Sequence, residues 1–108
     1  MLPSRISLHF AFKKIEQVIE QTLKLQVLEQ VAINQQFIAV GRTPPPVETL
    51  NLCRRNDQYV VVQTKGYEIN LLSVDDIAAL LNTLPAREHF PVKRYLSAVS
   101  NTSFAQNS

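Results

Sequence analysis

Few side chains in this sequence are able to do acid–base or nucleophilic chemistry. Cys53 is the only cysteine, and His9 and His89 are the only histidines. A thiol beside an imidazole can act as a nucleophile because the imidazole takes up its proton. Cys53 paired with a histidine is therefore the one enzymatic hypothesis, but a cysteine in a strand-like run is more often a small packing residue. We expect no catalytic activity.

Metal and phosphate sites also lack their usual residues. The two histidines stand far apart in the chain, and neither has a histidine or cysteine beside it. Asp75 and Asp76 are adjacent, so on a helix their side chains point about 100° apart and do not form a pair. With Gly41 and Gly66 as the only glycines, no glycine-rich phosphate loop can form. We expect no metal and no cofactor.

Cationic residues near predicted turns make nucleic-acid binding the main alternative function. Lysine and arginine contact phosphates, and Tyr59 or Tyr67 could stack on bases. Successive turns of a meander lie at alternating ends of its strands, so one continuous basic patch is not expected. The net charge of +2 is also small. The candidate nucleic-acid contacts are Arg54, Arg55, Lys65, Lys93 and Arg94.

Two segments suggest binding to another protein. The proline triplet is a stiff, extended segment of the kind that aromatic grooves hold. A short amphipathic helix predicted over residues 91–99 carries an apolar stripe that we expect to dock on a partner or on a second copy of the chain. Packing of this stripe on the chain's own sheet stays an open alternative. The candidate protein-interface residues are Pro44, Pro45, Pro46, Val92, Tyr95, Leu96 and Val99.

The composition is that of one small soluble domain in a reducing compartment. The chain has 108 residues, of which 45% are hydrophobic and 19% charged. A single cysteine allows no internal disulfide. The first residues do not form a signal-peptide core, and no run of about 20 apolar residues could span a membrane. We expect a cytoplasmic protein that does not bind membranes.

The first third of the chain changes its hydrophobic period. Apolar residues alternate over residues 6–12, which predicts a short strand. From Lys13 they recur at spacings of three and four, which predicts an amphipathic helix to about Ala32. Alternation also persists over residues 23–33, so a strand there stays an open alternative. Residues 37–41 are predicted to form a further strand, ended by the proline connector.

Three β-prone runs follow, at residues 47–53, 58–63 and 67–72. Short polar turns separate them, which predicts an antiparallel meander. Tyr67, Ile69 and Leu71 share one face of the last run, so one side of the sheet is expected to be covered and the other solvated.

A second helix is predicted directly after the meander. Ser73 can cap the free amides at its start, and the acidic residues that follow favour its positive end. Pro85 ends this helix, which is expected to cover the apolar face of the sheet. Its apolar stripe consists of Val74, Ile77, Leu81 and Leu84.

The predicted fold is therefore α+β: an antiparallel β-meander packed against one long N-terminal helix and one shorter C-terminal helix. A single domain is expected over residues 1–99, with a disordered tail at 100–108. The expected function is that of a non-catalytic protein-binding protein, a regulator, adaptor or assembly factor, whose partner is another protein or a second copy of the chain.

Overall fold

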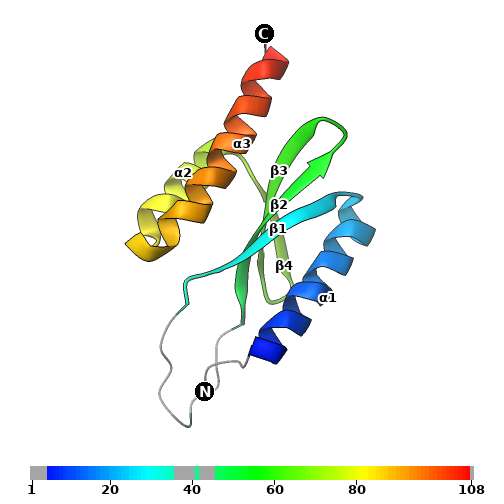
Figure 1. Ribbon diagram of the computed structural model, residues 1–108, viewed down its shortest axis with the longest axis vertical. Coiled ribbons are helices and arrows are strands. Elements are labelled where there is room, and N and C mark those ends of the chain that lie inside the picture. Colours follow the sequence, from blue (N-terminus) through cyan, green and yellow to red (C-terminus); the bar gives the residue numbers. More distant parts are fainter. Residues whose placement is uncertain (1–4, 36–40, 42–45, 108) are drawn as a thin grey trace.

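The computed structural model describes the backbone of residues 5–35, 41 and 46–107, and the side chains of residues 11–35, 41 and 46–101. Four antiparallel strands form one sheet in the order β1-β2-β3-β4, and helices stand at both ends of the chain (Figure 1). The predicted α+β meander is confirmed. The elements are α1 (Arg5–Leu23), β1 (Gln26–Ile33), β2 (Glu48–Arg55), β3 (Gln58–Lys65), β4 (Glu68–Leu72), α2 (Val74–Thr83), the 3-10 turn η1 (Ala86–Glu88) and α3 (His89–Asn107).

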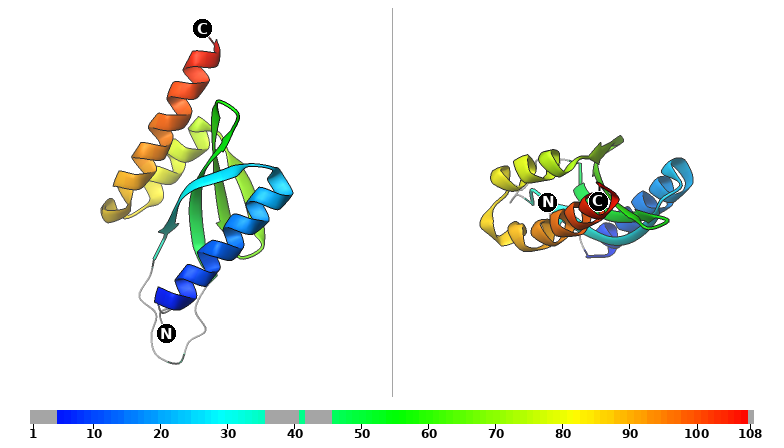
Figure 2. Two further views of the ribbon diagram at one scale, coloured as in Figure 1. Left: turned by 45° about the vertical axis from the view of Figure 1, so that its right-hand side comes forward. Right: turned by 90° about the horizontal axis from the view of Figure 1, so that it is seen from above.

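Helices cover both faces of the sheet. Figure 2 shows α1 on one side and the α2–α3 pair on the other. Side chains along the central strands alternate between the two faces, so apolar residues are needed on both. Leu50, Leu52 and Val61 pack toward α2 and α3, whereas Cys53 and Val62 pack toward α1. The prediction of one covered and one solvated face is therefore wrong. Helix α1 lies on the face of Ile69 and Leu71, and α2 and α3 lie on the face of Asn70, which was expected to be solvated.

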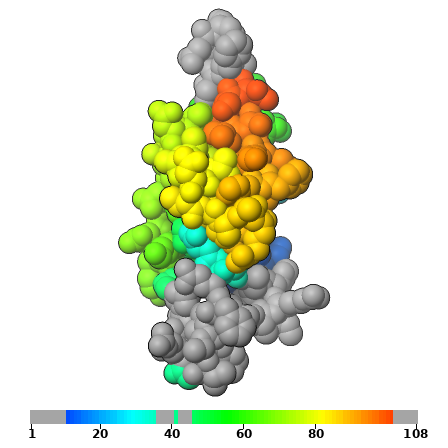
Figure 3. All heavy atoms as spheres, turned by 90° about the vertical axis from the view of Figure 1, so that its left-hand side faces the viewer, coloured from blue at the N-terminus to red at the C-terminus, as the bar shows by residue number. Residues whose placement is uncertain are grey.

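The larger hydrophobic core lies between the sheet and the α2–α3 layer, in which the two helices lie side by side (Figure 3). Strands and helices contribute to it in similar measure, so each layer depends on the other for burial of its apolar side chains. The buried members of this core are Ile33, Leu50, Leu52, Val61, Ile77, Leu84, Val92, Tyr95 and Val99.

The core under α1 is smaller, and a group of hydrogen-bonded polar side chains lies beside it. Its buried members are Ile19, Leu25, Cys53 and Val62. On the same face of the sheet the Asn51 amide donates to Thr49 Oγ1 and to the Val62 carbonyl, both at 3.0 Å. Gln30 Nε2 donates to Asn51 Oδ1 at 3.0 Å. Among the described residues these buried polar groups are satisfied, which keeps the cost of their burial low.

Helix α1 replaces the strand that was predicted over residues 6–12. The helix begins at Arg5, and its described apolar positions recur at helical spacing, with Ile19 buried and Phe12 and Ile15 partly buried. No glycine or proline stands between Arg5 and Leu23. The strongly periodic second half can therefore form the helix first. The helix can then extend toward the N-terminus, because each added residue contributes one more backbone hydrogen bond.

The helix predicted to run to Ala32 ends at Leu23 instead. Lys24 adopts a left-handed conformation, with φ of 59°, and a residue in this conformation ends a helix. The Arg55 guanidinium donates to the Leu23 carbonyl, one of those that the helix leaves unpaired. Residues 26–33 then form β1, so the strand alternative for this segment was the right one.

A β-bulge divides β1 into two parts. Val27 is paired with Cys53 and Glu29 with Leu52, so Leu28 is the extra residue. The extra residue reverses the alternation: Val27 packs toward α1, whereas Val31 packs toward α2 and α3. The bulge also leaves the Leu28 side chain 39% exposed.

The bounds of the last three strands and the start of α2 follow the prediction closely. The three predicted runs become β2, β3 and β4, each within two residues of the expected bounds. Ser73 Oγ accepts from the Asp76 amide at 3.1 Å, and the Asp76 carboxylate accepts from the Ser73 amide at 3.0 Å. This reciprocal capping box fixes the start of α2.

Helix α3 is longer and more central than predicted. It runs from His89 to Asn107, so residues 100–107 are helical where a disordered tail was expected. Val92, Tyr95 and Val99 are at most 7% exposed and belong to the main core. Leu96 is partly buried against the same core. The stripe predicted over residues 91–99 thus packs on the chain's own sheet, where docking on a partner was expected, because without α3 the strand residues beneath it would remain exposed.

Candidate functional site: a groove between α3 and the sheet

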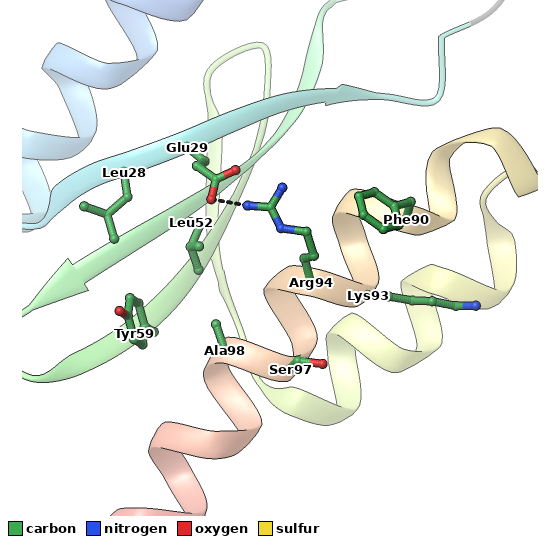
Figure 4. Close-up of a pocket in the computed structure, with 9 residues that line it drawn as sticks. All are labelled: Leu28, Glu29, Leu52, Tyr59, Phe90, Lys93, Arg94, Ser97 and Ala98. Carbon is green, nitrogen blue, oxygen red and sulfur yellow. Dashed lines mark hydrogen bonds and ion pairs between the residues drawn. The ribbon is translucent and has the colours of Figure 1, made fainter.

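An open groove of about 580 Å³ lies between α3 and one end of the sheet. The bulged part of β1 forms one wall, α3 forms the other, and β2 and β3 form the floor (Figure 4). The lining residues from the sheet are Leu28, Glu29, Leu52 and Tyr59, and those from the helix are Phe90, Lys93, Arg94, Ser97 and Ala98.

Two large apolar side chains line this groove and remain exposed. Phe90 is 72% exposed and Leu28 is 39% exposed. Leu52 on the floor is buried, and Tyr59 beside it is partly buried. Single exposed apolar residues are common, but several that share one concavity are typical of a binding surface.

An ion pair crosses the groove. Arg94 extends from α3 toward β1, and its Nη2 lies 2.5 Å from Glu29 Oε2 (Figure 4). Both side chains are about half exposed, at 49% and 41%. Lys93, one residue earlier, points away from this pair and has no ion-pair partner among the described residues.

The structure brings only some of the predicted nucleic-acid contacts together. Lys93 and Arg94 line the groove. Arg54 pairs with Tyr59 across β2 and β3 and so shares its face of the sheet, and its Nε donates to the Asn56 carbonyl. Arg55 belongs to the opposite face, and Lys65 lies at the far end of the hairpin. The five cations do not form one patch.

Cys53 does not meet a histidine among the described side chains. It is completely buried in the core under α1, and its thiol donates weakly to the Asn51 carbonyl at 3.5 Å. Burial, together with the charge of Glu20, raises the pKa of Cys53 to about 12, so the thiol is neutral near pH 7. His89 lies on the other side of the sheet, with Nε2 2.8 Å from the Leu84 carbonyl. His9 lies in α1, outside the described side chains.

The remaining predicted site residues are distributed as follows. Pro44 and Pro45 lie outside the described residues, as do most of the strand predicted at residues 37–41. Pro46 is exposed near the turn at Gly66. No group of three metal-ligating side chains occurs in the described part of the chain, and none of its described helices is long and apolar enough to cross a membrane.

Sequence reasoning missed the groove, although part of its signal was visible. The lining residues of α3 follow the spacing i, i+3, i+4 and i+7, from Phe90 to Ser97. This face adjoins the predicted stripe but is distinct from it. Leu28 gave no comparable signal, because its exposure depends on the bulge.

Comparisons with protein-family models, with curated proteins and with solved structures found no match.

Proposed function

We propose that this protein is a non-catalytic protein-binding protein, a regulator, adaptor or assembly factor, that holds a segment of its partner in the groove between α3 and the sheet. The observation that carries the proposal is the joint exposure of Leu28 and Phe90 along one groove, beside charged side chains. An apolar centre with a polar rim is the usual composition of a protein interface.

The openness of the groove favours a macromolecular partner over a small molecule. Small-molecule sites usually enclose most of the ligand surface. This groove is widely open to solvent, and Phe90 projects from its helical wall. A helix and a strand as walls leave room for a peptide segment to lie lengthwise between them.

The arrangement of cations and the apolar content of the groove favour a protein over nucleic acid. The five predicted cations do not form one patch along which a phosphate backbone could lie. Leu28 offers an aliphatic contact, which suits an apolar side chain better than a base. The partner is another protein or a second copy of the chain. A cytoplasmic location belongs to the same proposal, because the free thiol of Cys53 suits a reducing compartment.

Selection from a random-peptide display library tests the proposal. The wild-type protein is compared with Ser97→Trp, which fills the groove from an exposed position on α3. Asn82→Trp, at an exposed position on α2 outside the groove, is the matched control. We expect peptides to be enriched on wild type and on the control but lost on Ser97→Trp. No enrichment, or enrichment that Ser97→Trp leaves intact, would contradict the proposal.

A labelled oligothymidine tests the nucleic-acid alternative. We expect no binding tighter than about the micromolar range at physiological salt, the level of nonspecific contacts between cations and phosphates. Tight binding that falls steeply with salt and is lost in Lys93→Glu would replace protein binding with nucleic-acid binding as the function of the groove.

A further inference from the structure

We infer that the groove takes an acidic peptide segment with a large apolar side chain, and that a carboxylate of this segment displaces Glu29 from Arg94. This inference rests on the proposed function and names the chemistry of the partner. It follows from three features of the groove: its charge, the exposure of its ion pair, and the position of its apolar side chains.

The charge of the groove is incompletely balanced. Its charged lining residues are two cations, Lys93 and Arg94, and one anion, Glu29. The anion is engaged by Arg94, which leaves the Lys93 ammonium without a partner among the described residues. Arg54 adds a further cation on the same face of the sheet, beside Tyr59. An incoming carboxylate therefore complements the groove, whereas an incoming cation does not.

The Arg94–Glu29 pair can be exchanged for another pair. Both partners are about half exposed, and an ion pair in contact with solvent contributes little to stability. Arg94 could thus leave Glu29 for a ligand carboxylate at little net cost, since one charge-assisted hydrogen bond replaces another. Glu29 holds the guanidinium over the groove in the free protein and competes with the ligand for it.

The apolar residues provide a place for a side chain next to this carboxylate site. Phe90 precedes Arg94 by one helical turn, and Leu28 precedes Glu29 directly in β1. Leu52 and Ala98 close the groove from below and from the helix. A leucine or aromatic side chain that enters here covers the exposed surfaces of Phe90 and Leu28 while its acidic neighbour reaches Arg94.

The composition of the peptides enriched by display selection is the first test. We expect peptides with aspartate or glutamate next to leucine, phenylalanine or tryptophan. Enriched peptides that are basic, or that lack acidic residues, would overturn this inference and leave the proposed function standing. If nothing is enriched on wild type relative to Ser97→Trp, the proposed function itself fails.

Affinities of one enriched acidic peptide, measured by fluorescence anisotropy, are the second test. Lys93→Glu and Arg94→Gln should each weaken binding about tenfold or more. Glu29→Gln should strengthen it about threefold, because the competing carboxylate is gone. Lys14→Glu, at an exposed position on α1 across the sheet, is the charge-matched control and should change affinity little. Weaker binding in Glu29→Gln would show that Glu29 is a ligand contact and overturn the exchange.

The same peptide with its acidic residues changed to amides completes the test. Wild type should bind this amide peptide more weakly than the acidic peptide. Glu29→Gln should bind the amide peptide no more tightly than wild type does. Melting curves of all variants establish that each is folded at the temperature of the titration. Equal affinity of the acidic and the amide peptide for wild type would contradict recognition of a carboxylate.

Discussion

Arg94 on α3 and Glu29 on β1 meet at 2.5 Å across the groove, although they stand 65 positions apart in the chain. Both side chains are half exposed, so we expect this pair to matter more for binding than for folding. Glu29→Gln should lower the free energy of unfolding by less than about 1 kcal/mol in urea titration. A loss of several kcal/mol would mean that the pair is structural and not available for exchange.

Removal of α3 should unfold the protein. Val92, Tyr95 and Val99 are buried against the sheet, and the chain cut after Arg87 would leave that surface in water. We expect the truncated chain to lack a cooperative melting transition in circular dichroism. Within the full chain, Tyr95→Ala should cost about 3–5 kcal/mol, the usual effect of removing a buried aromatic side chain. Ser97→Ala, at an exposed position on the same helix, should stay within about 0.5 kcal/mol of wild type. A truncated chain that melts like the parent would contradict the placement of α3 in the core.

The Cys53 thiol should resist alkylation in the folded protein. Its burial raises the pKa from 9.0 to about 12, so at pH 8 it forms roughly a thousandfold less thiolate than an ordinary cysteine. Its completely buried position also excludes the reagent. Iodoacetamide labelling followed by mass spectrometry should be slow in buffer and fast in denaturing urea. Similar rates in the two solutions would show that the thiol is accessible, and would reopen a chemical role for it.

Stability should fall at alkaline pH. Burial raises the pKa of Cys53 from 9.0 to about 12 and that of Tyr95 from 10.0 to about 12. Both groups are neutral when protonated and their folded pKa values exceed the unfolded ones. Their stabilisation is therefore complete below about pH 9 and is lost as the pH rises toward 12. Cys53 should contribute a slope of up to about 1.4 kcal/mol per pH unit from about pH 9, and Tyr95 a similar slope from about pH 10.

The matched variants for this prediction are Cys53→Ala and Tyr95→Phe. Each removes one titrating group, so each should flatten the decline in unfolding free energy between pH 9 and 12. Each substitution also changes packing in the core, so only the slopes are compared. An unchanged slope in both variants would show that these groups do not cause the alkaline loss.

The parts of the fold that sequence predicted well are those specified by local chemistry. Polar turns separate the strands of the meander, and the reciprocal bonds of Ser73 and Asp76 fix the start of α2. The end of α1 was not predictable in the same way. Lys24 adopts a left-handed conformation that glycine usually marks, and the Arg55 contact to Leu23 comes from a distant strand.

The groove could not be predicted from the sequence for a related reason. It depends on the bulge at Leu28 and on the packing of α3, and both are set by tertiary contacts. The apolar stripe of Val92, Tyr95 and Val99 was identified correctly as a stripe, but its periodicity does not tell whether a helix packs on its own sheet or on a partner. Phe90 lies beside this stripe and remains exposed.

Binding in the groove is tested most directly by nuclear magnetic resonance on the ¹⁵N-labelled protein, titrated with an acidic peptide from the display selection. We expect the largest shift changes at the backbone amides of Leu28, Glu29, Phe90 and Lys93, and only small changes on the exposed face of α1. Shifts concentrated on α1 or on β4, with the groove unchanged, would contradict binding between α3 and the sheet.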